Sequence, residues 1–161
     1  MDYGLWTIFG MRARTKSREC ALQLLYQLDI RQGDPQRLLK EFWAEDESEH
    51  GVREFADQLF LGTVEHLPEL DALITRHADH WDLKRMAVID RNVLRLGAFE
   101  LLHLQEDVPP KVCINEAIEL AKRFGDTESG KFINGILDAI HKAAQCDGTV
   151  SPPPPPPPAV S

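Results

Sequence analysis

The chain has 161 residues, of which 43% are hydrophobic and 27% are charged, and its formal net charge at pH 7 is −8. These values are typical of a soluble globular protein with a single domain and a real hydrophobic core. The negative charge argues against nucleic-acid binding by the whole surface, although a local group of cations can still form a binding patch. No apolar run approaches the roughly 20 residues that a membrane-spanning helix needs, and we expect a cytoplasmic protein.

Residues 1–11 form an apolar leader that lacks the leading positive charge and the length of a signal peptide. We expect this leader to be poorly ordered, with Met11 as an alternative start of the protein. The next seven residues, RARTKSR, contain four cations, at Arg12, Arg14, Lys16 and Arg18. Even-numbered positions would spread around a helix, so we interpret the stretch as a flexible or fraying arm that wraps a phosphate backbone.

Tyr26 follows two helical turns after Arg18, where its ring could stack on an unpaired base. The alternative interpretation of the basic stretch is an N-terminus that aids solubility and has no ligand. Composition alone does not separate these two interpretations.

Apolar residues recur at helical spacing along most of the chain, and no segment shows the period of two that is typical of strands. The first helix is predicted to end near Arg31 to Gly33, and Asp34-Pro35 to begin a second. An acidic break over 45–49 precedes a third helix over 52–63, and Pro68 opens a shorter one. A long helical region then carries apolar residues from 83 to 101, with Gly97 as a candidate point of close helix approach.

The stretch from Asp107 to Leu137 predicts two further helices with a sharp stop between them. Pro110 can open the first of these, whose apolar residues run from Val112 to Phe124. Gly125 is expected to adopt the left-handed conformation that ends many helices, and Asp126 or Thr127 to cap the last helix. The fold class predicted is an all-α, single-domain bundle of about seven helices over 12–145, followed by a disordered proline-rich tail over 146–161.

The sequence contains no pattern typical of an active site. We find no phosphate-binding glycine loop and no activated nucleophile, so neither an enzyme nor a cofactor is expected. His77 and His80 have a spacing compatible with metal binding, but without a third ligand we interpret them as a solvated helix end. The three cysteines, which are far apart, predict reduced thiols rather than a disulfide framework or a metal site: Cys20, Cys113 and Cys146.

Three separated blocks resemble the NusB family of bacterial transcription antitermination factors, in the same order along the chain. They are RECALQLLYQ at 18–27, VLRLGAFEL at 93–101, and INEAIELAKRFG followed by ESGKFINGILD at 114–138. The resemblance covers most of 12–141 and is weakest over 32–49.

The resemblance implies a site for boxA RNA, a segment of ribosomal RNA leader transcripts. Its predicted residues lie in the basic stretch, at the following tyrosine and at the start of the last helix: Arg12, Arg14, Lys16, Arg18, Tyr26, Glu128, Lys131 and Phe132. The resemblance also implies that the central helical region contacts NusE, a small-subunit ribosomal protein, through Asp90 with Arg91 and Arg95 as neighbours. The sequence departs from the family pattern at three positions. The uncharged Thr15 and Ser17 interrupt the basic run, and Gly130 stands where some family members have a histidine.

The leading hypothesis is a non-catalytic adaptor that binds boxA-like single-stranded RNA together with NusE and joins NusA, NusG and RNA polymerase. One alternative is a protein-interaction module that uses the bundle surface and the proline tail without RNA. Another is an accessory domain of an RNA-modifying enzyme, against which the absence of a cofactor-binding domain argues. A homodimer is compatible with the resemblance, and no residue decides for or against it.

Overall fold

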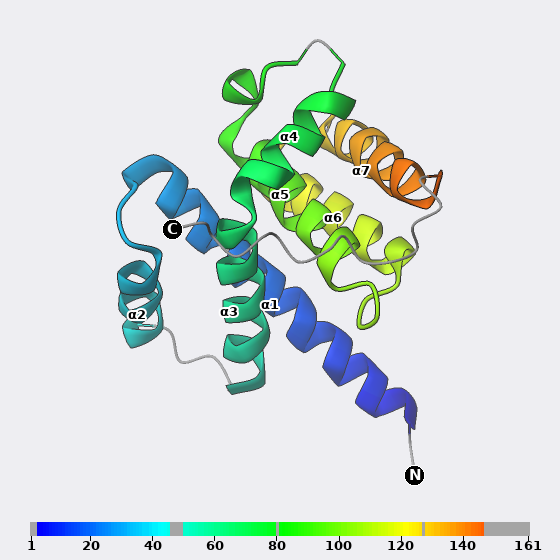
Figure 1. Cartoon of the computed structure of the whole chain (residues 1–161). Helices are drawn as coiled ribbons and strands as arrows, with labels where there is room; N and C mark the ends of the chain where they lie inside the picture. The colour runs from blue at the N-terminus through cyan, green and yellow to red at the C-terminus, as the bar shows by residue number, and fades with distance from the viewer. Residues whose placement is uncertain (1–2, 46–49, 80, 127, 147–161) are drawn as a thin grey trace, which may run out of the picture.

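The computed structural model describes residues 3–45, 50–79, 81–126 and 128–146. Within these ranges the chain forms seven α-helices, one short 3-10 helix and no strand, which confirms the predicted all-α fold (Figure 1). The elements are α1 (Tyr3–Arg31), α2 (Pro35–Glu45), α3 (His50–Glu65), α4 (Leu67–His77), η1 (Leu83–Arg85), α5 (Val88–His103), α6 (Pro110–Phe124) and α7 (Ser129–Cys146). In this part of the chain, no helix is both long enough and apolar enough to span a bilayer.

Helix α5 lies at the centre of the bundle and packs against α1, α3, α4, α6 and α7. Its residues from Asn92 to Leu101 are buried except for Arg95, because neighbouring helices cover it on every side. Gly97 allows α6 and α7 to approach α5 closely, since a Cβ atom there would lie 2.8 Å from Leu137 Cδ1 and 3.4 Å from Ala117 Cβ. The expectation that Gly97 marks a close helix approach is confirmed.

Most of the predicted helix boundaries are confirmed. Helix α1 ends at Arg31, and the turn that follows uses positive φ angles at Gln32 and Gly33. Proline lies at the start of α2 and in the first turns of α4 and α6, as expected from its missing N–H group.

The prediction of one long helical region over 83–101 is wrong. Met86 and Ala87 are extended, with ψ angles of 148° and 140°, and they separate η1 from α5. Asp82 accepts a hydrogen bond from the backbone N–H of Lys84, which begins η1 as a separate short element. Apolar residues continue on both sides of this break, so the hydrophobic pattern alone does not reveal it.

The connector between α6 and α7 differs in detail from the prediction. Gly125 has φ −111° and ψ −155°, an extended conformation rather than the expected left-handed one. Ser129 Oγ accepts a hydrogen bond from the backbone N–H of Asp126, and the backbone N–H of Ser129 donates to the Asp126 carbonyl. The reciprocal bonds close the connector, and the other expected cap, Thr127, lies outside the described residues.

The N-terminal region also differs from the prediction, because the basic stretch is helical rather than a flexible arm. Helix α1 begins at Tyr3, so it includes part of the expected leader and all of Arg12 to Arg18. Once the packed half of α1 has formed, each further residue adds a backbone hydrogen bond without a new nucleation step. Residues 1–2 and most of the predicted tail, 147–161, lie outside the described residues.

A buried ion pair joins α1 to α5. Arg18 donates two hydrogen bonds to Glu100 Oε1, at 3.0 and 2.8 Å, and one to Oε2 at 3.1 Å, and both side chains are only 2% exposed. Glu116 of α6 adds a second carboxylate, 3.7 Å from the Arg18 guanidinium. Burial raises the pKa of Glu100, although the hydrogen bonds and the charge of Arg18 oppose that shift. This pair fixes which face of α1 turns inward.

Replacing Arg18 should strongly destabilise the fold. Arg18→Ala leaves Glu100 buried without its partner, which costs about 3–5 kcal/mol of unfolding free energy. Arg14→Ala is the matched control, because Arg14 lies one turn earlier on the same helix but is exposed. Urea unfolding of the two variants measures the difference, and equal stability of the Arg18→Ala variant and the unsubstituted protein would contradict the account.

The two helical glycines Gly97 and Gly135 should respond oppositely to alanine. Gly135→Ala adds a Cβ atom that meets nothing within 4 Å, so the better helix propensity should stabilise the protein by about 0.5–1 kcal/mol. Gly97→Ala places its Cβ atom against Leu137, and overpacking should cost about 1–3 kcal/mol. Thermal unfolding distinguishes the two, and a gain in melting temperature for Gly97→Ala would show that α5 and α7 are not closely packed.

Candidate functional site

The predicted basic residues lie on two opposite faces of α1. Arg12, Lys16 and Tyr26 share the outer face, because residues four and fourteen positions apart return to nearly the same side of an α-helix. Arg12 and Lys16 are exposed, and the Tyr26 ring is 39% exposed. Figure 1 shows the N-terminal half of α1 extending past α3 and α6.

The other two predicted cations, Arg14 and Arg18, lie on the inner face of α1. Their guanidinium groups lie 4.7 and 5.6 Å from the centroid of the Phe55 ring of α3. Arg14 remains exposed and donates a hydrogen bond of 3.3 Å to the Asp107 carbonyl. Arg18 is committed to Glu100, so we correct the prediction that it contacts RNA and assign it to the core.

A shallow hollow of about 320 Å³ lies at the far end of the outer face of α1. Tyr26 and Leu22 of α1, Ile89 of α5 and Phe124 of α6 are among the residues that line it. Phe124 is 40% exposed, so two aromatic rings border an apolar depression that is open to solvent. A flat, partly exposed ring of this kind can stack on a nucleic-acid base.

An ion pair between Glu19 and Arg123 links the middle of α1 to the end of α6 beside this hollow. We call the set of Arg12, Lys16, Tyr26, Arg123 and Phe124 the α1–α6 strip. Arg12 and Lys16 lie toward the N-terminal end of α1, whereas Tyr26 and Phe124 border the hollow at the other end, where Arg123 is paired with Glu19. Sequence reasoning missed Arg123 as a site residue and counted Phe124 only among the apolar residues of its helix, because helical periodicity does not reveal which apolar residue at a helix end stays exposed.

Lys131 and Phe132 lie in the first turn of α7, just after the connector from Phe124. Lys131 is exposed, and Phe132 is half-buried with its ring edge-on to the exposed Trp81 ring at 5.8 Å between centroids. Glu128 is also exposed, but it makes no ion pair with Lys131 in the described part of the chain. The predicted place of Glu128 in the RNA site stays a prediction.

Two of the three residues predicted to contact NusE, Arg91 and Arg95, already form ion pairs within the chain. Arg91 and Arg95 both bind Asp29 at the end of α1, at 2.7 and 3.2 Å, and Arg95 also binds Asp71 of α4 at 2.7 Å. Burial raises the pKa of Asp29, but hydrogen bonds from Arg91 and Asn92 and the two arginine charges lower it on balance. These arginines hold helices together, and their contact with NusE stays a prediction.

Asp90 lies in the first turn of α5 and is half-buried. Its Oδ1 atom is buried without a hydrogen-bond partner among the described residues. A Cβ atom at Gly125 would lie 3.1 Å from this oxygen, so Asp90 lies directly beneath the α6–α7 connector. An acidic group at a helix N-terminus is favoured by the helix dipole.

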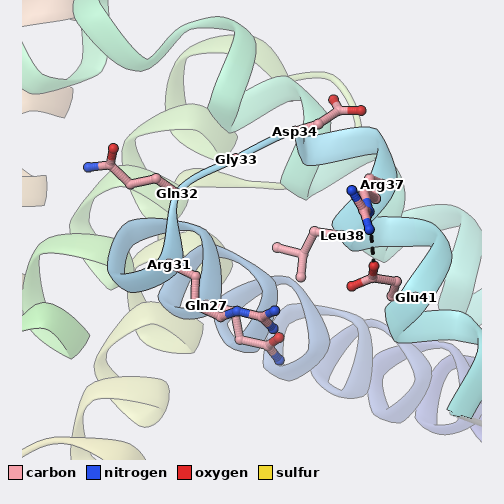
Figure 2. Close-up of a pocket in the computed structure, with 8 residues that line it drawn as sticks. All are labelled: Gln27, Arg31, Gln32, Gly33, Asp34, Arg37, Leu38 and Glu41. Atoms are coloured by element: carbon pink, nitrogen blue, oxygen red, sulfur yellow. Dashed lines mark hydrogen bonds and ion pairs between the residues drawn. The ribbon is translucent and has the colours of Figure 1, made fainter.

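A second hollow, also of about 320 Å³, lies between the end of α1 and the start of α2 (Figure 2). Polar and charged groups line most of it, including Gln27 and Arg31 on one side and an ion pair between Arg37 and Glu41 at 3.2 Å on the other. Leu38 lies between these groups in Figure 2. None of the predicted site residues lines this hollow.

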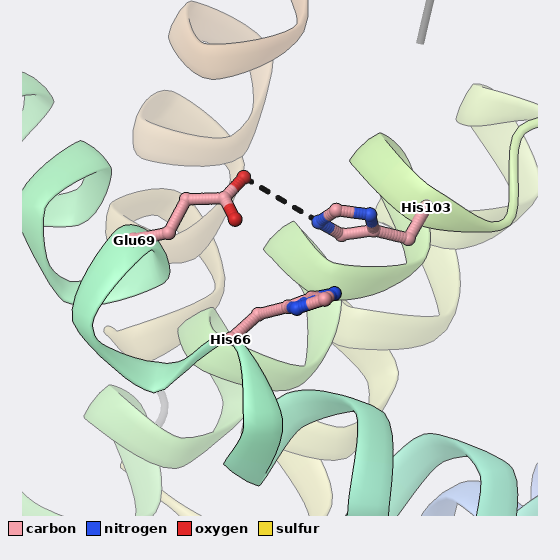
Figure 3. Close-up of side chains that lie close together, drawn as sticks. All are labelled: His66, Glu69 and His103. Carbon is pink, nitrogen blue, oxygen red and sulfur yellow. Dashed lines mark ion pairs between the residues drawn. The ribbon is translucent and has the colours of Figure 1, made fainter. Parts of the chain in front are cut away.

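Three potential metal ligands, His66, Glu69 and His103, lie close together where the start of α4 meets the end of α5 (Figure 3). Burial and the neighbouring His66 lower the pKa of His103, and Glu69 only partly offsets this. Sequence reasoning missed this cluster and considered His77 and His80 instead, of which His80 lies outside the described residues.

Elsewhere in the fold, burial raises the pKa of Cys113, whose thiol donates to the Gly97 carbonyl. This cysteine therefore stays protonated.

Comparisons with known proteins show which family the chain belongs to. The transcription antitermination protein NusB of Sorangium cellulosum is 45% identical over 130 residues, which are 81% of this chain and 92% of that protein. The NusB protein of Myxococcus xanthus is 46% identical over 134 residues, or 81% of this chain and 95% of the relative. These are names of transcription factors rather than of enzymes.

Solved structures of similar proteins have the same fold. T. maritima NusB is 43% identical with a TM-score of 0.74, and the match covers 80% of this chain and 90% of that one. A crystal structure of the antitermination factors NusB and NusE in complex with dsRNA matches with 34% identity and a TM-score of 0.74, covering 83% and 98%. The model of the NusB family matches residues 15–142. This chain is a member of the NusB family.

Proposed function

We propose that this protein is a non-catalytic transcription antitermination factor that binds boxA-like single-stranded RNA of ribosomal RNA leader transcripts together with NusE. The observation that carries the proposal is the α1–α6 strip, where Arg12 and Lys16 project from the same helix face as Tyr26. On a chain with a net charge of −8, this local group of cations is where a phosphate backbone would be attracted.

The strip has the two chemical elements of single-strand recognition. Its cations can follow the backbone, and the rings of Tyr26 and Phe124 can stack on bases, which contributes about 1–3 kcal/mol for each stacked base. Lys131 and Phe132 follow directly along the chain and extend the surface at the start of α7. Arg14 is exposed but already makes contacts with Phe55 and Asp107, so we assign it a smaller share of the binding.

The family supports the role of NusE in this proposal. A relative of similar fold has been solved with NusE and double-stranded RNA, whereas selectivity for a single-stranded boxA sequence is part of our proposal. We propose that NusE contacts the surface near Asp90, where the start of α5 lies against the α6–α7 connector. Arg91 and Arg95 already form ion pairs within the chain. The loaded complex would then join NusA, NusG and RNA polymerase.

Neutralising the cationic end of the strip should weaken RNA binding and reduce its dependence on salt. For Arg12→Gln with Lys16→Gln, we expect the plot of log K against log salt to become shallower. The magnitude of its negative slope should decrease by about 1.4, or about 0.7 for each lost single-strand phosphate contact. The matched control is Lys40→Gln with Arg76→Gln, which makes the same charge change at exposed positions on α2 and α4. Fluorescence titration at several salt concentrations measures both slopes, and equal slopes in the two double variants would exclude the strip as the RNA site.

A further inference from the structure

We propose that His66, Glu69 and His103 form a zinc-binding site that joins the corner between α3 and α4 to the end of α5. One donor atom from each of the three residues lies within 4.8 Å of the other two. His103 Nε2 lies 3.4 Å from Glu69 Oε1, and the two imidazole rings are 4.1 Å apart between centroids. Figure 3 shows the three side chains converging from two different helices and the junction that precedes α4.

The set of donors matches zinc better than magnesium or calcium. Two imidazole nitrogens with one carboxylate oxygen are common zinc ligands, whereas magnesium and calcium prefer sites made entirely of oxygen. Zinc bonds of about 2.0–2.1 Å in a tetrahedron place neighbouring ligand atoms roughly 3.3 Å apart. The three donor atoms, which lie within 4.8 Å of one another, are therefore already near that spacing. Because Glu69 is 39% exposed, water can reach the fourth position.

The clearest sign that a ligand belongs here is His103 Nε2. This atom is buried and makes no geometrically satisfactory hydrogen bond among the described residues, and the Glu69 oxygen beside it lies 3.4 Å away. Buried polar side-chain atoms in folded proteins are nearly always satisfied. A zinc ion between His103 and Glu69 would satisfy both groups.

The two imidazole rings are already held in place by the fold. The Phe99 ring stacks on His103 at 5.3 Å and contacts His66 at 5.8 Å. Phe99 can reach this position because Gly62 has no side chain, since a Cβ atom there would lie 2.1 Å from the ring. The backbone of His66 donates to the Gly62 carbonyl at 3.1 Å and accepts from the Leu70 N–H at 2.9 Å. Preorganised ligands of this kind lose little freedom when a metal binds.

Zinc titration of the full chain tests the proposal, with Cys146→Ser as the background because the exposed thiol of Cys146 can itself bind zinc. Calorimetry is expected to show one zinc ion per chain, and cobalt to give the visible absorption of a tetrahedral site. Zinc should also raise the melting temperature, because it binds only the folded arrangement.

Two variants locate the bound ion. His103→Gln should weaken zinc binding by at least about tenfold, and Glu69→Gln gives a second test at a more exposed position if the first variant unfolds. His50→Gln is the control, because His50 Nε2 lies 2.9 Å from Glu54 Oε1 on an exposed surface without a third ligand. No measurable binding, or equal affinity in the background protein and both site variants, would overturn the proposal and leave His103 and Glu69 as an ion pair.

Discussion

The buried pair between Arg18 and Glu100 determines what α1 can do. A long helix packed on one side can rotate about its axis, and only specific contacts set which face is turned inward. Arg18 points into the bundle and is held by three hydrogen bonds to one carboxylate. Residues on the opposite side of α1, including Arg12 and Lys16, are therefore turned to solvent. The pair thus specifies an orientation, a role that is separate from any net contribution to stability.

A second group of ion pairs holds the C-terminal end of α1. Asp29 accepts from Arg91, Asn92 and Arg95, so the last turns of α1 are fixed to the start of α5. With the middle and the C-terminal end of α1 held in this way, Tyr26 lies beside the end of α6, where Phe124 is only half covered. The α1–α6 strip is therefore a consequence of how three helices meet, and each of its side chains comes from a rigid element.

Much of the fold could be predicted because the helices follow local rules. Periodic apolar residues and prolines at helix starts located nearly every helix, and a glycine within an apolar helical stretch, Gly97, marked a candidate point of close approach. The break at Met86 and Ala87 could not be predicted, since the apolar pattern runs through it.

The candidate site was harder to predict because it depends on contacts between distant residues. The even spacing of the cations was interpreted as an arm, whereas in the structure it divides them between two faces of one helix. The burial of Arg18 depends on Glu100, 82 residues away in the sequence.

The most direct test of the central claim is titration of labelled boxA RNA and a scrambled control, with and without purified NusE. The account predicts tighter binding of boxA RNA that NusE strengthens further, and that Tyr26→Ala weakens. Equal binding of both RNAs in the presence of folded NusE would contradict it.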